Sequence, residues 1–272
     1  MLRTLHINKQ KNSGFTMVEV AVVVLIVGML FPLFSFILNM YHDAYFLDEK
    51  VKMNNEGAQA LWYIEESVRI SNSFLAVVPS EFVDAYGPNN AGTAGAQAWS
   101  YKGSSPTSRV LMTRNYSTTA NALNTARQPV FKNSGTFNCT TEMFYQPQLT
   151  YISIYFVRNN TLYYRVLTDK TSPLCPGNVQ QQKLSCPPEI TSGRHASCEA
   201  DDEVLARNVS EFSVKYFRIL EEGLSEQIDS TYTSTNPDVL LVADYAEVTL
   251  TESVRGGAIR SSLTQRMTKV NQ

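Results

Sequence analysis

Histidine and carboxylate side chains are the first candidates for chemistry in this sequence. The three histidines lie far apart in the chain, and no G-x-S-x-G, Walker A or H-E-x-x-H string occurs that would place a nucleophile, a phosphate loop or a zinc site. Carboxylates adjacent in sequence do not face one another on a helix or strand, so such pairs predict solvated surface. The residues concerned are His6, His42, His195, Glu65/Glu66, Asp201/Asp202 and Glu221/Glu222. We therefore do not expect an enzyme, a cofactor or a metal site.

The cysteines point to a different chemistry. Cys139, Cys175, Cys186 and Cys198 are even in number and lie in a polar, loop-rich part of the chain, which suits disulfides in an oxidising compartment. No C-x-x-C pair occurs and only His195 lies near them, so zinc is the weaker interpretation. Four cysteines allow three pairings. We favour a local Cys186–Cys198 bridge with Cys139–Cys175 as the other.

A basic segment and an apolar run open the sequence. Residues 1–14 carry Arg3, Lys9 and Lys11 and no acidic residue, which favours the cytoplasmic side of a membrane. Residues 20–38 follow as 19 residues without a charge, about the length that crosses a hydrocarbon core. The sequence therefore predicts one membrane-spanning helix with the remainder of the chain outside the cytoplasm.

Two ordinary interpretations of this start leave one residue unexplained. A secretory signal peptide would be cut after the apolar run, but residues 39–48 offer no clear small-x-small site. A plain signal anchor accounts for the basic flank and the span. Neither accounts for Glu19, because a carboxylate at the start of a membrane helix is costly and usually has a partner and a purpose.

The string Ser13-Gly14-Phe15-Thr16-Met17-Val18-Glu19 resembles the processing site of the type IV prepilin family. The resemblance implies that a prepilin peptidase cuts between Gly14 and Phe15 and methylates the new amine of Phe15. It also implies that Glu19 neutralises that amine, or the amine of a neighbouring subunit, within an apolar helix bundle. The partners implied are the peptidase, other major and minor pilins or pseudopilins, an inner-membrane assembly platform and membrane lipid.

The helix is expected to continue beyond the membrane. Pro32 lies inside the span, where it removes one backbone hydrogen bond and should bend or loosen the helix. An apolar stripe then predicts helix to about Ile70, with Trp62 and Ile64 widening the apolar face over the head. The stripe comprises Ala44, Leu47, Val51, Ala58, Leu61 and Val68. The expected organisation is a leader at 1–14, a membrane part at 15–38, an amphipathic stalk at 39–71 and a head at 72–272.

The head is expected to be rich in strands. Residues 149–157 alternate as a strand does, Asn159-Asn160 suits a tight turn, and 161–168 completes a hairpin. Further strands are predicted at 209–217, 245–251 and 263–270. Polar stretches at 84–108, 115–128 and 169–200 are predicted to be loops. One long helix followed by these strands predicts an α+β fold with a mainly antiparallel sheet.

The head segments YYRVLT, LARNVSEFSVKYF and YAEVTLTES also look like strands of large minor pilins and J-type pseudopilins. The formal net charge of −2 gives no global field that would attract nucleic acid. Two hypotheses remain for function. The chain is a minor subunit that primes or caps a filament, or it is a membrane-tethered binding module at a filament tip. A pilus, a competence apparatus and a type II secretion system all fit this N-terminus.

Overall fold

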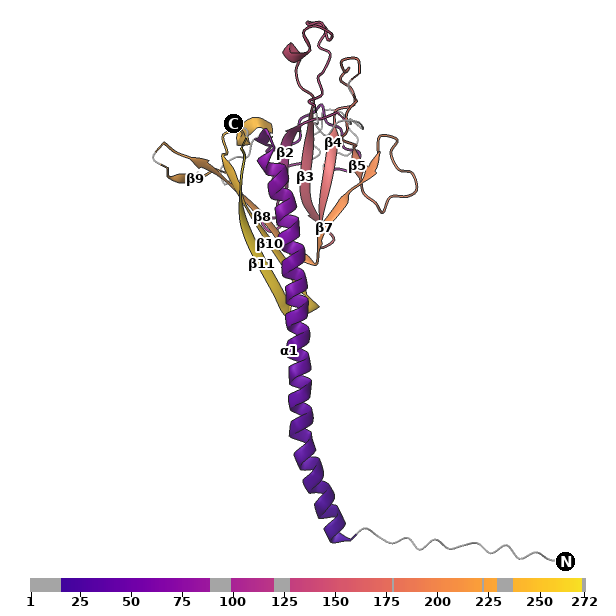
Figure 1. Cartoon of the computed structure of the whole chain (residues 1–272), viewed down its shortest axis with the longest axis vertical. Coiled ribbons are helices and arrows are strands. Elements are labelled where there is room, and N and C mark those ends of the chain that lie inside the picture. The colour runs from indigo at the N-terminus through magenta and orange to yellow at the C-terminus, as the bar shows by residue number, and fades with distance from the viewer. Residues whose placement is uncertain are drawn as a thin grey trace, which may run out of the picture. The chain divides into compact units, whose positions relative to one another are not determined.

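The computed structural model describes residues 16–88, 99–119, 128–177, 179–221, 223–228 and 237–270. One long helix, α1 (Met17–Arg69), is followed by antiparallel strands (Figure 1). This is the α+β architecture predicted from the sequence, with two disulfides in the head. The chain divides into two compact units, Met1–Glu49 and Lys50–Gln272. The expected leader and the residues on both sides of its cleavage site, Gly14 and Phe15, lie outside the described residues.

The first unit contains the apolar part of α1. The helix is continuous past Pro32, so the missing backbone hydrogen bond does not end it. Large apolar side chains from Met17 to Leu38 are 47–92% exposed. The helix is long and apolar enough to cross a membrane.

The second half of α1 belongs to the head unit and contributes one face to its core. Ile64 lies in this face as expected, but Trp62 is 63% exposed, so its predicted place in the core is wrong. Trp62 follows Leu61 directly, and one residue is about 100° around a helix, which turns the indole away from the buried face. The buried positions are Met53, Gly57, Ala60, Leu61, Ile64 and Val68.

The first sheet has the order β1-β2-β3-β4-β7, and every pairing in it is antiparallel. Its strands are β1 (Ser73–Phe74), β2 (Leu111–Tyr116), β3 (Thr150–Arg158), β4 (Thr161–Thr168) and β7 (Glu203–Arg207). The predicted β3–β4 hairpin is confirmed, and Asn159 and Asn160 both have positive φ, 51° and 56°. β2 was not predicted, and its last residues, Asn115 and Tyr116, fall in a stretch assigned to a loop.

The second sheet has the order β11-β10-β8-β9 and is also antiparallel. Its strands are β8 (Val209–Ile219), β9 (Ser225–Gln227), β10 (Tyr245–Val254) and β11 (Ile259–Thr268). β8, β10 and β11 are the remaining predicted strands, each displaced or lengthened by a few residues. A short parallel pair, β5 (Ser185–Cys186) and β6 (Ala200–Asp201), lies within and at the end of the stretch 169–200, which was predicted to be a loop throughout. Single-turn 3₁₀ helices are η1 (Met143–Tyr145), η2 (Pro237–Leu240) and η3 (Arg255–Gly257).

A single hydrophobic cluster joins both sheets and the second half of α1. The Phe74 ring of β1 meets the Tyr216 ring of β8 edge to face at 5.3 Å, which links the two sheets. Leu61, Ile64 and Val68 of α1 are at most 2% exposed within this cluster. Burial of these side chains from water is the main force that holds this half of the helix to the strands.

Candidate functional site

The start of α1 is built by two side chains that cap each other. The Thr16 backbone N–H and hydroxyl both donate to Glu19 Oε2, at 2.9 and 3.0 Å. The Glu19 N–H donates to Thr16 Oγ1 at 3.3 Å. This reciprocal arrangement is a capping box, which satisfies backbone N–H groups that the first turn of a helix leaves without partners. From the sequence, Glu19 was expected to neutralise the amine of Phe15, and the capping role of T-x-x-E was not predicted.

The capping box gives Glu19 a purpose within its own chain. It does not exclude an additional role, because a carboxylate has two oxygens and about four acceptor positions. The expected cleavage would create an ammonium at Phe15, next to Thr16 in the sequence. The same carboxylate could then neutralise an amine and still cap the helix.

The head contains a buried cluster of charges that sequence analysis did not find. Arg165 of β4 donates from Nε and Nη2 to Asp202, at 3.0 and 2.5 Å, and from Nη1 to Asp84 at 2.9 Å. All three side chains are at most 1% exposed. Asp202 was predicted, with Asp201, to be solvated surface, and that prediction is wrong. The residue is buried because a guanidinium from a distant strand compensates its charge.

We call Asp84, Arg165 and Asp202 the Arg165 triad. Two neutral side chains outside the triad also donate hydrogen bonds to its carboxylates. The Trp99 indole N–H donates to Asp84 Oδ2 at 2.5 Å, and the Ser185 hydroxyl donates to Asp202 Oδ1 at 2.9 Å. Burial alone would lower the pKa of Arg165, but the two carboxylates outweigh it and raise the pKa above its ordinary value. The guanidinium therefore stays charged, and the triad fastens Asp84, after β1, and Asp202, between β6 and β7, to β4.

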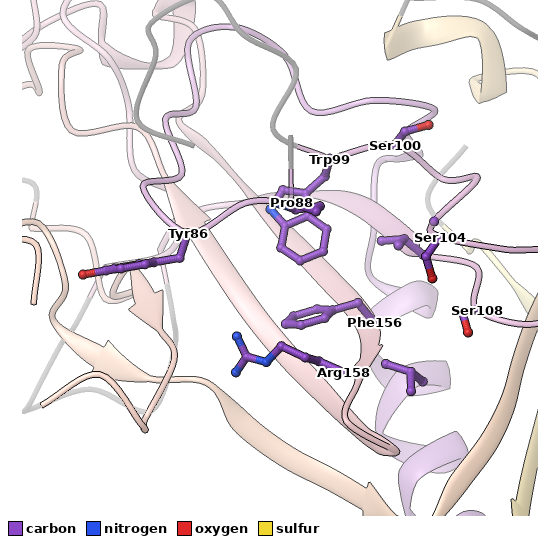
Figure 2. Close-up of a pocket in the computed structure, with 11 residues that line it drawn as sticks. Tyr86, Pro88, Trp99, Ser100, Ser104, Ser108, Phe156 and Arg158 are labelled. Carbon is purple, nitrogen blue, oxygen red and sulfur yellow. The ribbon is translucent and has the colours of Figure 1, made fainter. Parts of the chain in front are cut away.

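Figure 2 shows an aromatic pocket, and one of its lining residues, Trp99, is the residue that donates to Asp84 of the triad. The Trp99 and Phe156 rings are 4.5 Å apart, and Arg165 lies over both of them, at 5.4 and 5.2 Å from their centroids. The cavity has a volume of about 310 Å³, and Tyr86 and Arg158 also line it. Its described lining contains serine hydroxyls but no carboxylate or histidine, so it could hold a small apolar group and offers no acid–base pair.

The disulfides join Cys139 to Cys175 and Cys186 to Cys198, the pairing favoured from the sequence. Their Cα atoms are 5.4 and 5.7 Å apart, as ordinary disulfides require. The Asp202 N–H donates to the Cys186 carbonyl at 2.8 Å, so the second bridge and the Arg165 triad fasten the same segment. Within the described ranges, no group of three or more His, Cys, Asp or Glu side chains is placed to hold a metal ion.

One signal in the sequence could have revealed the triad. Arg165 stands in the middle of the apolar strand YYRVL, and a charged residue at such a position needs buried partners. Its partners Asp84 and Asp202 lie 81 and 37 residues away, and neither stands inside a predicted apolar strand that would indicate burial. No protein-family model and no curated protein matches this chain. Its function must therefore be argued from its own residues.

Proposed function

We propose that this chain is a minor type IV pilin or pseudopilin, cut by a prepilin peptidase and built into an extracytoplasmic filament. One feature carries the proposal: a single helix of 53 residues whose first half is apolar and exposed and whose second half packs on a β-rich head. That helix begins at the T-x-x-E of a string resembling the prepilin processing site.

The exposed half of α1 requires a cover. Its apolar side chains cannot remain in water, so lipid covers them before assembly. In a filament the same surface would pack against equivalent helices of neighbouring subunits. The head would then be displayed outside the membrane, where the two disulfides are stable.

A second candidate function is a membrane-tethered binding module. It is favoured by the exposed aromatic side chains of the head, since Phe144 is 83% exposed and Tyr145 is 72% exposed. The two functions are compatible in one subunit. Loss of filaments on deletion of the chain would favour the structural function, and normal filaments without attachment would favour the binding module.

The test of the proposal begins with the N-terminus of the protein made in its own cells. Mass spectrometry should find that the mature chain starts at N-methylated Phe15, because Gly14 is the expected last residue of the leader. An intact Met1 in assembled material, or a cut after Leu38, would contradict the pilin assignment.

Matched variants then separate the two roles of Glu19. Glu19→Gln retains a side-chain acceptor for the capping box and removes the charge, whereas Thr16→Ala removes the cap and keeps the carboxylate. If the carboxylate pairs with a buried amine, Glu19→Gln should lower incorporation into sheared filaments by about 100-fold or more, relative to the cleaved membrane pool. Thr16→Ala should lower it far less. Equal incorporation of Glu19→Gln and wild type would leave capping as the sole role of Glu19.

A further inference from the structure

We propose that the loop formed by residues 133–146, here called the tip loop, is a binding site for neutral carbohydrate. In Figure 1 it is the rose-coloured segment that projects past the ends of β3 and β4 and carries the short η1 helix. The inference goes beyond the proposed function and does not rest on it, because it concerns the head unit alone.

Three aromatic rings are presented on this loop. Phe144 is 83% exposed, Tyr145 72% and Phe137 41%. The Phe137 and Tyr145 rings lie 5.8 Å apart at 34° to one another. The Phe144 ring meets the buried Phe131 ring edge to face at 6.0 Å. Large aromatic groups that face water, although buried neighbours are within reach, indicate a surface kept for a ligand.

The loop is fixed at its base. The Lys132 N–H donates to the Pro147 carbonyl at 2.8 Å, and the Asn133 N–H donates to the Pro173 carbonyl at 2.7 Å. The Cys139–Cys175 disulfide ties the middle of the loop to the same segment. These links join the tip loop to two other stretches of backbone.

The interior of the loop is organised around one amide. Gln146 is 3% exposed. Its Oε1 accepts from the Ser134 N–H and hydroxyl, at 3.0 and 2.7 Å, and its Nε2 donates to the Phe137 carbonyl at 2.5 Å. The backbone that carries the aromatic residues is therefore organised before any ligand arrives, which reduces the conformational entropy lost on binding.

The polar groups around the rings determine the class of ligand. They are neutral amides and hydroxyls that both donate and accept hydrogen bonds. The exposed ones are Asn133, Ser134, Thr136, Asn138, Thr140 and Thr141. Asn133 Oδ1, Ser134 Oγ and Asn138 Oδ1 already accept from N–H groups of the loop, so the other polar atoms of this set are the ones offered to a ligand. Sugar hydroxyls have the same dual capacity, and the apolar C–H face of a pyranose packs flat on an aromatic ring. A ring surface bordered by neutral dual-capacity groups therefore matches an uncharged sugar.

Charge and size argue against other ligands. Glu142 is the single charged residue of the tip loop, which contains no lysine or arginine. Anionic polysaccharides, nucleic acids and anionic membranes would meet no cation there. A stable protein interface needs about 800 Å² from each partner, more than three side chains on a 14-residue loop can supply. One or two sugar rings need much less.

The test uses the full chain in nanodiscs, with its disulfides intact and no filament present. The probes are neutral polysaccharides (cellulose, chitin, mannan and galactan), the anionic polysaccharides alginate and heparin, and phosphatidylcholine vesicles. We expect at least one neutral polysaccharide to bind and the anionic ones and vesicles not to bind. The double variant Phe144→Ser/Tyr145→Ser should weaken that binding at least tenfold.

Two further variants complete the design. Trp62→Ser removes an exposed aromatic residue from α1 and should bind as the wild type does, since its ring lies outside the tip loop. Cys139→Ser/Cys175→Ser should weaken binding with the rings intact, because the loop loses its preorganisation. The inference is wrong if no neutral polysaccharide binds, if alginate, heparin or vesicles bind equally well, or if the Phe144/Tyr145 variant retains binding. None of these outcomes depends on filament assembly, so failure here leaves the proposed function standing.

Discussion

Replacement of Arg165 by methionine should destabilise the head strongly. Methionine fills a similar volume but leaves Asp84 and Asp202 as buried carboxylates without a cation. Removing one partner of a buried ion pair typically costs about 3–5 kcal/mol. A folded domain is stable by about 5–15 kcal/mol, so this loss is a large fraction of the total. At a urea m-value of about 2–3 kcal/mol/M, the unfolding midpoint should fall by about 1–2.5 M.

Trp99 supplies the assay, because its indole N–H is bonded to Asp84. The chain has two tryptophans, and Trp62 is exposed, so a Trp62→Phe background leaves Trp99 as the sole tryptophan, which can be excited selectively over the tyrosines. Urea unfolding of the full chain in detergent, with disulfides intact, would be followed by Trp99 emission. Wild type and Arg165→Met would be compared in that background.

Two control variants test whether Arg165 stabilises the head by compensating the buried carboxylates. Arg158→Met removes another arginine near Phe156, but the Arg158–Glu189 pair is 30% and 51% exposed and should contribute at most about 1 kcal/mol. The triple variant Asp84→Asn/Arg165→Met/Asp202→Asn removes all three charges and should recover most of the stability lost by Arg165→Met. If Arg165→Met matches the wild type, or if the triple variant is no better than Arg165→Met, charge compensation is not what the triad provides.

Two titratable groups of the head should shape its pH dependence. Burial, reinforced by Glu56, raises the pKa of Glu252 to about 8. The folded state therefore retains a proton that the unfolded state releases, and stability should fall from about pH 4.5 to 8 by up to about 1.4 kcal/mol per pH unit. Glu252→Gln should flatten that slope in urea unfolding across pH. Burial alone would raise the pKa of Asp169, but hydrogen bonds from Ser172 and Lys132 lower it well below its ordinary value. The stability that Asp169 contributes is present above about pH 4 and is lost as the pH falls further. Asp169→Asn should therefore lower the free energy of unfolding at pH 7 by about 1.5–3 kcal/mol and make that free energy depend less on pH below pH 4. The same dependence on pH below pH 4 in the variant and the wild type would contradict this.

The β3–β4 hairpin was predictable because its information is local. Alternation marks both strands, and Asn159 and Asn160 tolerate the positive φ that the turn requires. β2 was not predictable in the same way. Its inward residues include Asn115, which is 1% exposed and donates from Nδ2 to Ser153 Oγ on β3 at 2.9 Å. A polar residue that is satisfied by a neighbouring strand has the same sequence signature as a loop residue.

The same limit applies to the candidate sites. The helix start could be found from the sequence because Thr16 and Glu19 lie three residues apart and act together. Asp202 could not be placed, because its burial depends on Arg165, 37 residues away. The sequence shows that the tip loop contains aromatic residues. It does not show whether Phe144 faces the core or the solvent, because the surrounding fold decides this. The disulfide pairing was predictable although it is a tertiary contact, because four cysteines allow only three pairings. The buried charges and the exposure of the aromatic rings were not, because many sequence positions could have supplied them.

Polar contacts along the edges of α1 define how the helix lies on the head. The Ser261 hydroxyl donates to Asn54, and the Gln265 amide donates to Glu65. Farther on, the Val270 N–H donates to the Arg69 carbonyl at 3.2 Å. Residue numbers rise together on both partners, so the helix and this C-terminal strand run in the same general direction.

The helix and the C-terminal strand differ in length between their first and last contacts. Helix residues 54–69 advance about 22 Å at 1.5 Å per residue, whereas extended residues 261–270 advance about 30 Å. Side chains of different reach make up this difference at Asn54 and Glu65, whereas the contact at Arg69 joins backbone to backbone. A shift of α1 by one residue would break these polar contacts and also rotate Leu61 and Ile64 out of the core. The head is therefore held to its half of the helix in one register.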